Sequence, residues 1–311
     1  MKLYFAPMEG ITVYTYRNTH AEIFGGCDEY FAPFIVPTEN EKISRKTLRD
    51  ILPENNIVKL RPQILTNSSE AFVQFAQRIK YLDYSELNLN LGCPSGTVVK
   101  KNRGAGALRD VDGLESFFEN VFSSTDIKVS VKTRAGFSGH DEFDRIIDVY
   151  KKYPIDELIV HPRVRMEYYN GVPNIESFEK AYKLLSFNLC YNGDVRSLAE
   201  YHKIAGMYPS LSGIMIGRGA VANPAIFREI KGGEKLKTIE LVEFSRLLEE
   251  RYLKLLGSEK YTLHKLKEIW LYMMWNYPDE KKIIKAVKKS NKLSELTNAI
   301  NCLPEEVYRY E

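Results

Sequence analysis

A cysteine, two asparagines and a basic loop follow one another within one short stretch of the chain, residues 88–108. Cys93 ends the apolar run NLNLGC and precedes a proline, while Asn88 and Asn90 alternate with leucines. A thiol with a pKa near ~8.5 is mostly protonated at neutral pH, so it can donate a proton. Cys93 is therefore a candidate general acid; the alternative is a small buried residue at a strand end.

Three basic residues, Lys100, Lys101 and Arg103, follow this cysteine directly. A loop with this charge can bind the phosphates of a nucleic acid and close over a base beside the thiol. The short stretch therefore combines a candidate acid with a candidate anion-binding loop.

Eight β-prone segments alternate with helical patterns over the first 230 or so residues. The expected strands are 2–8, 29–35, 57–65, 85–93, 127–135, 157–162, 187–193 and 212–219. Helical periodicity is found at 68–82, 110–122, 141–153, 174–185 and 197–208, whereas 36–56 is irregular. Regular alternation predicts an α/β fold, a closed (β/α)8 TIM barrel with a parallel sheet.

Polar residues gather at the carboxyl ends of these expected strands, where such barrels hold their reactive groups. They are Pro7–Glu9, Gln63, Asn88, Asn90, Cys93, Lys132, Arg134, His161, Arg163, Asn192, Gly193, Asp194, Gly217, Arg218 and Gly219. Because all carboxyl ends of a parallel barrel meet at one mouth, we expect a single polar site there.

The last two strand ends, NGDV and IGRGAVANP, are glycine-rich turns that lead into helices. Backbone amides in such turns bind phosphate, although glycines can also serve only to shape a tight turn. A buried Lys132 needs an anion or an electron-rich ring as a partner. His161 is either a structural histidine or a contact to the same ligand.

After Gly232–Gly233 the pattern becomes purely helical, with expected helices at 238–256, 262–276, 279–290 and 292–301. We therefore expect a barrel domain over residues 1–233 and an α-helical bundle domain over 234–311. Trp270, Met273, Met274 and Trp275 are crowded together and are interpreted as the packed core of this bundle.

The whole excess of positive charge lies in the helical part. The net charge is +3, and residues 281–292, KKIIKAVKKSNK, hold six lysines without an acidic residue. Lys281, Lys285 and Lys288 share one face of a helix because of their spacing. This lysine stripe is either a solvated face or a surface for the phosphates of a nucleic acid.

Composition excludes several other classes of protein. No apolar run reaches the ~18 residues of a membrane span, and the amino terminus lacks the apolar core of a signal peptide, so we expect a cytoplasmic protein. Four scattered cysteines favour neither a metal site nor a disulfide framework. No obligate protein partner is evident.

Seven segments resemble the tRNA-dihydrouridine synthases, flavin enzymes with a barrel and a helical tail. They are APMEGIT (6–12), LNLGCP (89–94), RGAGAL (103–108), VKTRAGF (131–137), VHPR (160–163), NGDV (192–195) and IMIGRGAVANPAIF (214–227). They come in the order of the family and cover nearly the whole barrel.

The resemblance implies reduction of the C5=C6 bond of a tRNA uridine, with a hydride from FMNH2, a proton from Cys93 and NADPH or NADH as the reductant. The implied FMN contacts are Pro7, Met8, Glu9, Gln63, Lys132, His161, Asn192, Gly193, Asp194, Gly217 and Arg218. The implied contacts to the target base or to tRNA are Asn90, Lys100, Lys101, Arg103, Arg134, Arg163, Lys281, Lys285 and Lys288.

Three positions depart from the family pattern: Val13 and Ser212 where aspartate is common, and Pro162 where glycine is common. Two rival functions stay open, an FMN-dependent oxidoreductase of free pyrimidines related to dihydroorotate dehydrogenase and a non-catalytic RNA-binding barrel. The basic helical tail favours tRNA over a free pyrimidine, since a small substrate does not need it. Retention of Cys93, Lys132 and Arg218 argues against an inactive barrel.

Overall fold

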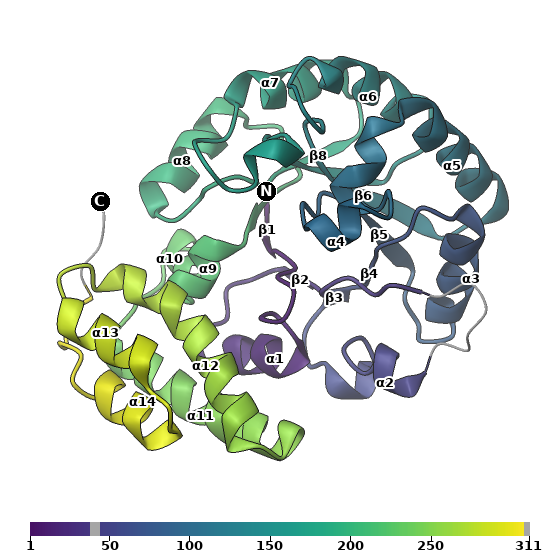
Figure 1. Cartoon of the computed structure of the whole chain (residues 1–311). Helices are drawn as coiled ribbons and strands as arrows, with labels where there is room; N and C mark the ends of the chain where they lie inside the picture. Colours follow the sequence, from purple (N-terminus) through teal and green to yellow (C-terminus); the bar gives the residue numbers. More distant parts are fainter. Residues whose placement is uncertain (38–43, 308–311) are drawn as a thin grey trace.

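The computed structural model describes residues 1–37 and 44–307, and it shows a barrel with a group of helices beside it (Figure 1). Within these ranges nine strand segments form one parallel sheet in the order β3-β2-β1-β9-β8-β7-β6-β5-β4. They are β1 (Lys2–Phe5), β2 (Glu29–Phe31), β3 (Leu60–Arg61), β4 (Gln63–Ile64), β5 (Glu86–Leu91), β6 (Lys128–Arg134), β7 (Glu157–His161), β8 (Asn188–Tyr191) and β9 (Gly213–Ile216). The predicted TIM barrel is confirmed.

The third expected strand is divided into β3 and β4 by Pro62, which lacks an N–H for the ladder. The two short pieces pair with opposite neighbours, β3 with β2 and β4 with β5. Because these pieces are consecutive in the chain, this pairing closes the barrel.

Helices surround the sheet, and each of the five segments with expected helical periodicity contains one. They are α1 (Tyr14–Ile23), α2 (Arg45–Leu48), α3 (Ser69–Lys80), α4 (Gly96–Val99), α5 (Val111–Ser124), α6 (Glu142–Tyr150), α7 (Ile175–Leu184), α8 (Leu198–Met207), α9 (Arg218–Ala222) and α10 (Ile226–Ile230). In α3 the Ser68 side chain accepts a hydrogen bond from the Ala71 amide, and Phe72, Phe75 and Ile79 are buried. The irregular interval holds only α2 and a short 3₁₀ turn, Pro53–Asn55; residues 38–43 lie outside the described part.

The strands bury both of their faces. Leu3 and Phe5 belong to the core between strands and helices, while Tyr4 packs inside the barrel with Phe31 and Met215. Arg61 fills the amino-terminal end of the barrel, where it bonds Glu29 at 3.0 Å and Glu157 at 2.7 Å.

Ser212 explains one departure from the family pattern. Its hydroxyl donates to Glu157 at 2.6 Å, so it joins the ion-pair cluster around Arg61. An aspartate at this position would place a second carboxylate against Glu157, and two like charges at that distance repel.

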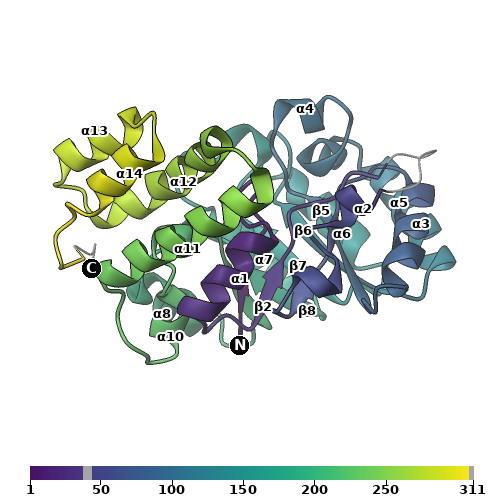
Figure 2. The ribbon, with the colours of Figure 1, turned by 90° about the horizontal axis from the view of Figure 1, so that it is seen from below.

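Four further helices follow the barrel: α11 (Thr238–Leu256), α12 (Glu259–Met273), α13 (Lys281–Lys289) and α14 (Leu293–Ile300). Figure 2 shows α11 lying along α1, and α12 packs against α9. Lys265 of α12 donates to the Gly10 carbonyl at 2.7 Å, which ties the helices to the loop after β1. The domain boundary near residue 233 stays a prediction.

The expected core of the helical part includes Trp270, Met273 and Met274, all of which are buried. Trp275 differs because the chain passes from α12 into the 3₁₀ turn Met274–Asn276, which directs its ring toward the barrel. No helix among the described residues combines the length and apolar character that crossing a membrane would require.

Trp270→Ala should lower the free energy of unfolding by about 3–5 kcal/mol, because it removes a fully buried indole and its hydrogen bond to Ser245. Chemical denaturation measures the change. Leu271→Ala, at an exposed position of the same helix, is the control. Equal losses for both variants would contradict this packing.

Candidate active site

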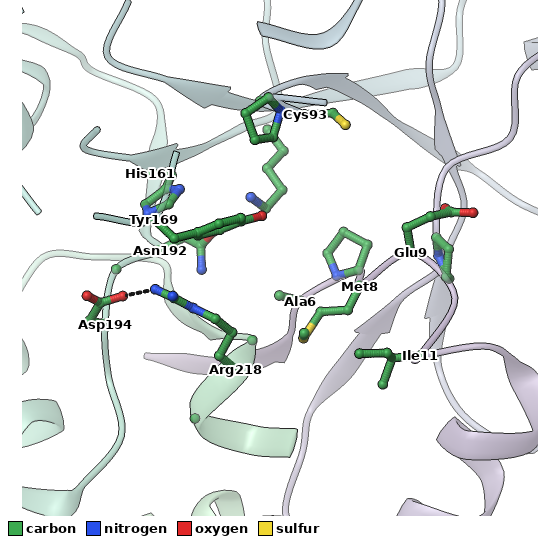
Figure 3. Close-up of a pocket in the computed structure, with 18 of the residues that line it drawn as sticks. Ala6, Met8, Glu9, Ile11, Cys93, His161, Tyr169, Asn192, Asp194 and Arg218 are labelled. Atoms are coloured by element: carbon green, nitrogen blue, oxygen red, sulfur yellow. Dashed lines mark hydrogen bonds and ion pairs between the residues drawn. The ribbon is translucent and has the colours of Figure 1, made fainter. Parts of the chain in front are cut away.

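A cavity of about 480 Å³ opens at the carboxyl ends of the strands (Figure 3). Most of the predicted cofactor residues line it: Pro7, Met8, Glu9, Lys132, His161, Asn192, Gly193, Asp194, Gly217 and Arg218. Cys93, Asn90 and Arg134 line it too. The expected convergence of strand ends on one mouth is therefore seen in the structure.

The sequence predicted that Cys93 ends a strand, but the residue lies two positions beyond the end of β5. The strand ends earlier because the Asn90 side chain turns the chain there. The Asn90 Oδ1 atom accepts hydrogen bonds from the amides of Gly92 at 3.0 Å and Cys93 at 2.9 Å. Arg134 Nε donates to the Gly92 carbonyl at 2.9 Å from the neighbouring strand. The thiol is therefore carried on a turn that is fixed from two sides.

The basic loop is folded back against this turn. The Ala105 amide donates to the Cys93 carbonyl at 3.1 Å, and Gly104 has a φ of +56°. A Cβ atom on Gly104 would lie 2.9 Å from that carbonyl oxygen, so the position requires glycine.

Burial raises the pKa of the Cys93 thiol, and the nearby Glu9 carboxylate acts in the same direction. Its hydrogen bond with the Ser95 backbone and the charges of Arg134 and Lys132 oppose this shift only in part. The thiol therefore stays protonated at neutral pH, which is the state that a proton donor needs.

A row of amides lies behind the cavity wall. Asn90 Nδ2 donates to Gln63 Oε1 at 2.8 Å, and Gln63 Nε2 donates to Asn88 Oδ1 at 2.7 Å. Asn88 Nδ2 in turn donates to the Ser130 hydroxyl at 2.9 Å. Gln63 is fully buried and does not line the cavity, so in this structure it supports Asn90.

Lys132 extends into the cavity from β6 without a hydrogen bond or ion pair to any residue in the described ranges. Burial lowers the pKa of its ammonium group to about 8, and the Arg134 charge adds to the shift. A largely buried ammonium without a partner is costly, so this position is suited to an anionic or electron-rich ligand.

Arg163 is fully buried and stays behind the lining of the cavity. It donates to Asp194 Oδ2 at 2.7 Å, to the Gly171 carbonyl at 2.6 Å and to His161 Nε2 at 2.9 Å. The predicted contact of Arg163 with RNA therefore has no support in the structure. Because arginine can only donate, His161 Nε2 must accept, which places the imidazole proton on Nδ1.

The turns after β8 and β9 form the other end of the cavity. Asp194 is ion-paired with both Arg163 and Arg218. The amides of Gly193 and Asp194 donate to no group among the described residues. A Cβ atom on Gly193 would lie 2.1 Å from the Tyr191 hydroxyl, so only glycine fits. Free amides beside arginines bind phosphate.

The other two departures from the family pattern, at Val13 and Pro162, have little effect on the geometry of the site. Val13 precedes α1 and supplies no side-chain cap, so α1 begins without the hydrogen bond that an aspartate would accept. Pro162 lacks an amide donor, but its carbonyl accepts from the Asn174 amide at 2.7 Å and holds the start of α7.

Sequence reasoning missed several residues of the cavity wall, among them Tyr169, Arg196, Glu268, Tyr272 and Trp275. Tyr169 lies in a loop after β7, and its ring covers Arg134 at 5.3 Å and Arg218 at 4.6 Å. The last three come from the helical part. Nothing in their spacing marks them, because their position depends on how the helices pack on the barrel.

The remaining basic residues lie outside the cavity. Lys100 and Lys101 are exposed on the loop after α4, whereas Arg103 donates to the Asn67 side chain at 3.1 Å. Lys281, Lys285 and Lys288 are exposed on one face of α13, opposite the buried Val287. The three lysines of the predicted stripe are thus all exposed, and their contact with RNA stays a prediction.

Comparison with known proteins identifies relatives. The family model described as dihydrouridine synthase matches residues 4–307. The tRNA-dihydrouridine synthase B of Escherichia coli K12 is 26% identical over 79% of this chain and 78% of its own length. The enzyme of the same name from Shewanella oneidensis is 27% identical over 82% and 80%.

Among solved structures, morphinone reductase aligns with a TM-score of 0.52 and 11% identity, covering 75% of this chain and 86% of its own. At this identity the likeness concerns the fold alone, and it agrees with the barrel.

Lys132→Met should stabilise the ligand-free protein at pH 7, by about 1–3 kcal/mol, because it removes a buried charge. The pKa of Lys132 in the folded protein, about 8, lies below its ordinary value of 10.5. The folded state therefore binds fewer protons between these values, and the stability of the wild type rises with pH there. Chemical denaturation should show the advantage of the variant shrinking from pH 8 to 10.5; an advantage independent of pH would contradict the prediction.

Proposed function

The chain belongs to the dihydrouridine synthase family, and we propose that it reduces the C5=C6 bond of a uridine in tRNA to 5,6-dihydrouridine. The proposal includes FMN as the cofactor, NADPH or NADH as the reductant and a cytoplasmic location. The observation that carries it is the Cys93 thiol on a fixed turn, with its pKa raised by burial, in one cavity with Lys132, which has no partner among the described residues, and with two glycine-rich turns.

The residues of the cavity fit a flavin mononucleotide. A volume of about 480 Å³ lies within the range of cofactor sites. The free amides of Gly193 and Asp194, with Arg218, would hold the phosphate. Lys132 would bind the electron-rich edge of the ring system, and Met8 would lie along it.

Bound reduced flavin supplies the hydride for C6 of the uracil. The protein's part is the proton for C5, which we assign to the Cys93 Sγ–H. Asn90 and Arg134 hold the backbone of Gly92 and Cys93, so the thiol keeps one position relative to the base. A proton donor must be held this closely for efficient transfer.

Asn90 acts through this turn in our proposal. Its Oδ1 atom is committed to two amides and its Nδ2 atom to Gln63, which leaves one N–H for the target base. Arg134 has the same positioning role, because its guanidinium is bonded to the carbonyls of Gly92 and Val164.

Two exposed basic surfaces would bind the tRNA. Lys100 and Lys101 flank the turn that carries Cys93, and the lysine stripe of α13 lies on the helical part. The target base must leave its stack to enter the cavity, so contacts on both sides of it are needed to hold the bent RNA.

Cys93→Ala should retain bound flavin and lose most turnover, at least 100-fold, because it removes the group to which we assign the proton for C5. Stopped-flow absorbance measures reoxidation of the reduced flavin by unmodified tRNA. Cys302→Ser, which removes an exposed thiol far along the chain, is the control. Wild-type rates for Cys93→Ala would remove this residue from the mechanism. Wild-type protein that takes up no flavin would overturn the proposed function.

Lys285→Glu combined with Lys288→Glu should weaken tRNA binding by at least tenfold and reduce its dependence on salt, since two phosphate contacts are lost. Filter binding at several salt concentrations measures both effects. Lys151→Glu with Lys152→Glu, just after α6 on the other side of the molecule, is the matched control (Figure 1). Equal effects of the two pairs would show that the stripe acts only through net charge.

A further inference from the structure

Arg196 and Trp275 meet at the rim of the cavity, although they lie 79 positions apart in the chain. The Arg196 guanidinium stacks on the Trp275 ring at 5.0 Å from its centroid. Arg196 follows the turn after β8, and Trp275 belongs to the 3₁₀ turn after α12. The pair therefore joins the barrel and the helical part beside Asp194.

The positive charges around Asp194 are not balanced by the residues that the structure describes. Its carboxylate pairs with Arg163 and Arg218, and Arg196 approaches it at 3.7 Å. Three guanidinium groups thus share one carboxylate, which leaves two positive charges without a counter-ion in the described part of the chain. A phosphate monoester carries close to two negative charges at neutral pH.

Arg196 differs from the other two arginines because its guanidinium makes no hydrogen bond to the described residues. Its side chain is 48% exposed, and 3.7 Å to Asp194 exceeds hydrogen-bonding distance. Stacking on an indole occupies the face of a guanidinium and leaves its in-plane N–H groups free, in the geometry that binds phosphate with two bonds.

The backbone of Arg196 is also fixed. Its amide donates to Glu200 at 2.6 Å, next to the capping box that begins α8. Trp275 is supported by an edge contact with Tyr272 at 5.3 Å, and Asn276 anchors the turn to the Ala222 carbonyl at 2.6 Å. Arg196 and Trp275 are therefore each held in place by contacts within their own part of the chain.

From these observations we infer that Arg196 is a further ligand of the FMN phosphate, and that Trp275 positions it. The inference rests on the proposed function. It makes the helical part a component of the cofactor site, in addition to its role in binding RNA. A phosphate of the RNA backbone is the competing occupant, but the amides of Gly193 and Asp194, which donate to none of the described residues and lie inside the cavity beside Arg196, favour the cofactor.

Titration of flavin-free protein with FMN and with riboflavin, which lacks the phosphate, tests the inference through quenching of flavin fluorescence. Arg196→Gln should raise the Kd for FMN about tenfold and leave the Kd for riboflavin unchanged. Trp275→Ala should cause a smaller loss that again affects FMN alone. Trp275→Phe, which keeps an aromatic face, should restore most of it.

Arg246→Gln, an exposed arginine of α11 outside the cavity, is the matched control and should change neither Kd. Riboflavin binding also reports whether each variant is folded. An unchanged ratio of the two Kd values in Arg196→Gln would overturn the inference. Weaker binding of tRNA in that variant, with FMN unaffected, would do so too and would assign Arg196 to the RNA. Failure of the wild type to bind either flavin would instead overturn the proposed function.

Discussion

The ion pair between Arg163 and Asp194 fixes the arrangement on which the rest of the site depends. Arg163 is buried, and its hydrogen bonds reach the loop after β7, the turn after β8 and the ring of His161. One side chain therefore joins two neighbouring strand ends and sets the tautomer of the histidine between them. Removing Asp194 would leave the fully buried Arg163 guanidinium without its counter-charge, and an uncompensated buried charge is strongly destabilising.

Much of the fold could be read from the sequence, because a parallel barrel repeats one pattern. Strands β5 to β9 lie within the expected segments, and α11 spans the expected residues 238–256. The ends of the strands were harder to place. The expected strand 85–93 stops at Leu91, since the Asn90 side chain satisfies the next amides itself. A side chain that competes with the hydrogen bonds of the strand leaves no periodic pattern in the sequence.

The site was predictable as far as local motifs define it. Glycine turns and a lysine on a buried strand can be recognised from a few neighbouring residues of the sequence. The same is true of most of the cavity residues near them. The burial of Arg163 and the direction of the Trp275 ring cannot be recognised from neighbouring residues. The first depends on carbonyl groups seven and eight positions away and on Asp194, which is 31 positions away. The second depends on a 3₁₀ turn that changes the direction of a helical face.

Each side-chain amide in the row behind the cavity has one allowed orientation of its oxygen and nitrogen atoms. An amide that reversed would set oxygen against oxygen on one side and N–H against N–H on the other, so its neighbours would have to reverse with it. The backbone amides of Gly92 and Cys93 can only donate, so the Asn90 Oδ1 atom must accept from them. That choice is passed through Gln63 to Asn88, whose Nδ2 atom then donates to the Ser130 hydroxyl. The turn that carries Cys93 thus selects the orientation of every amide behind the cavity, with no movement of the backbone between them.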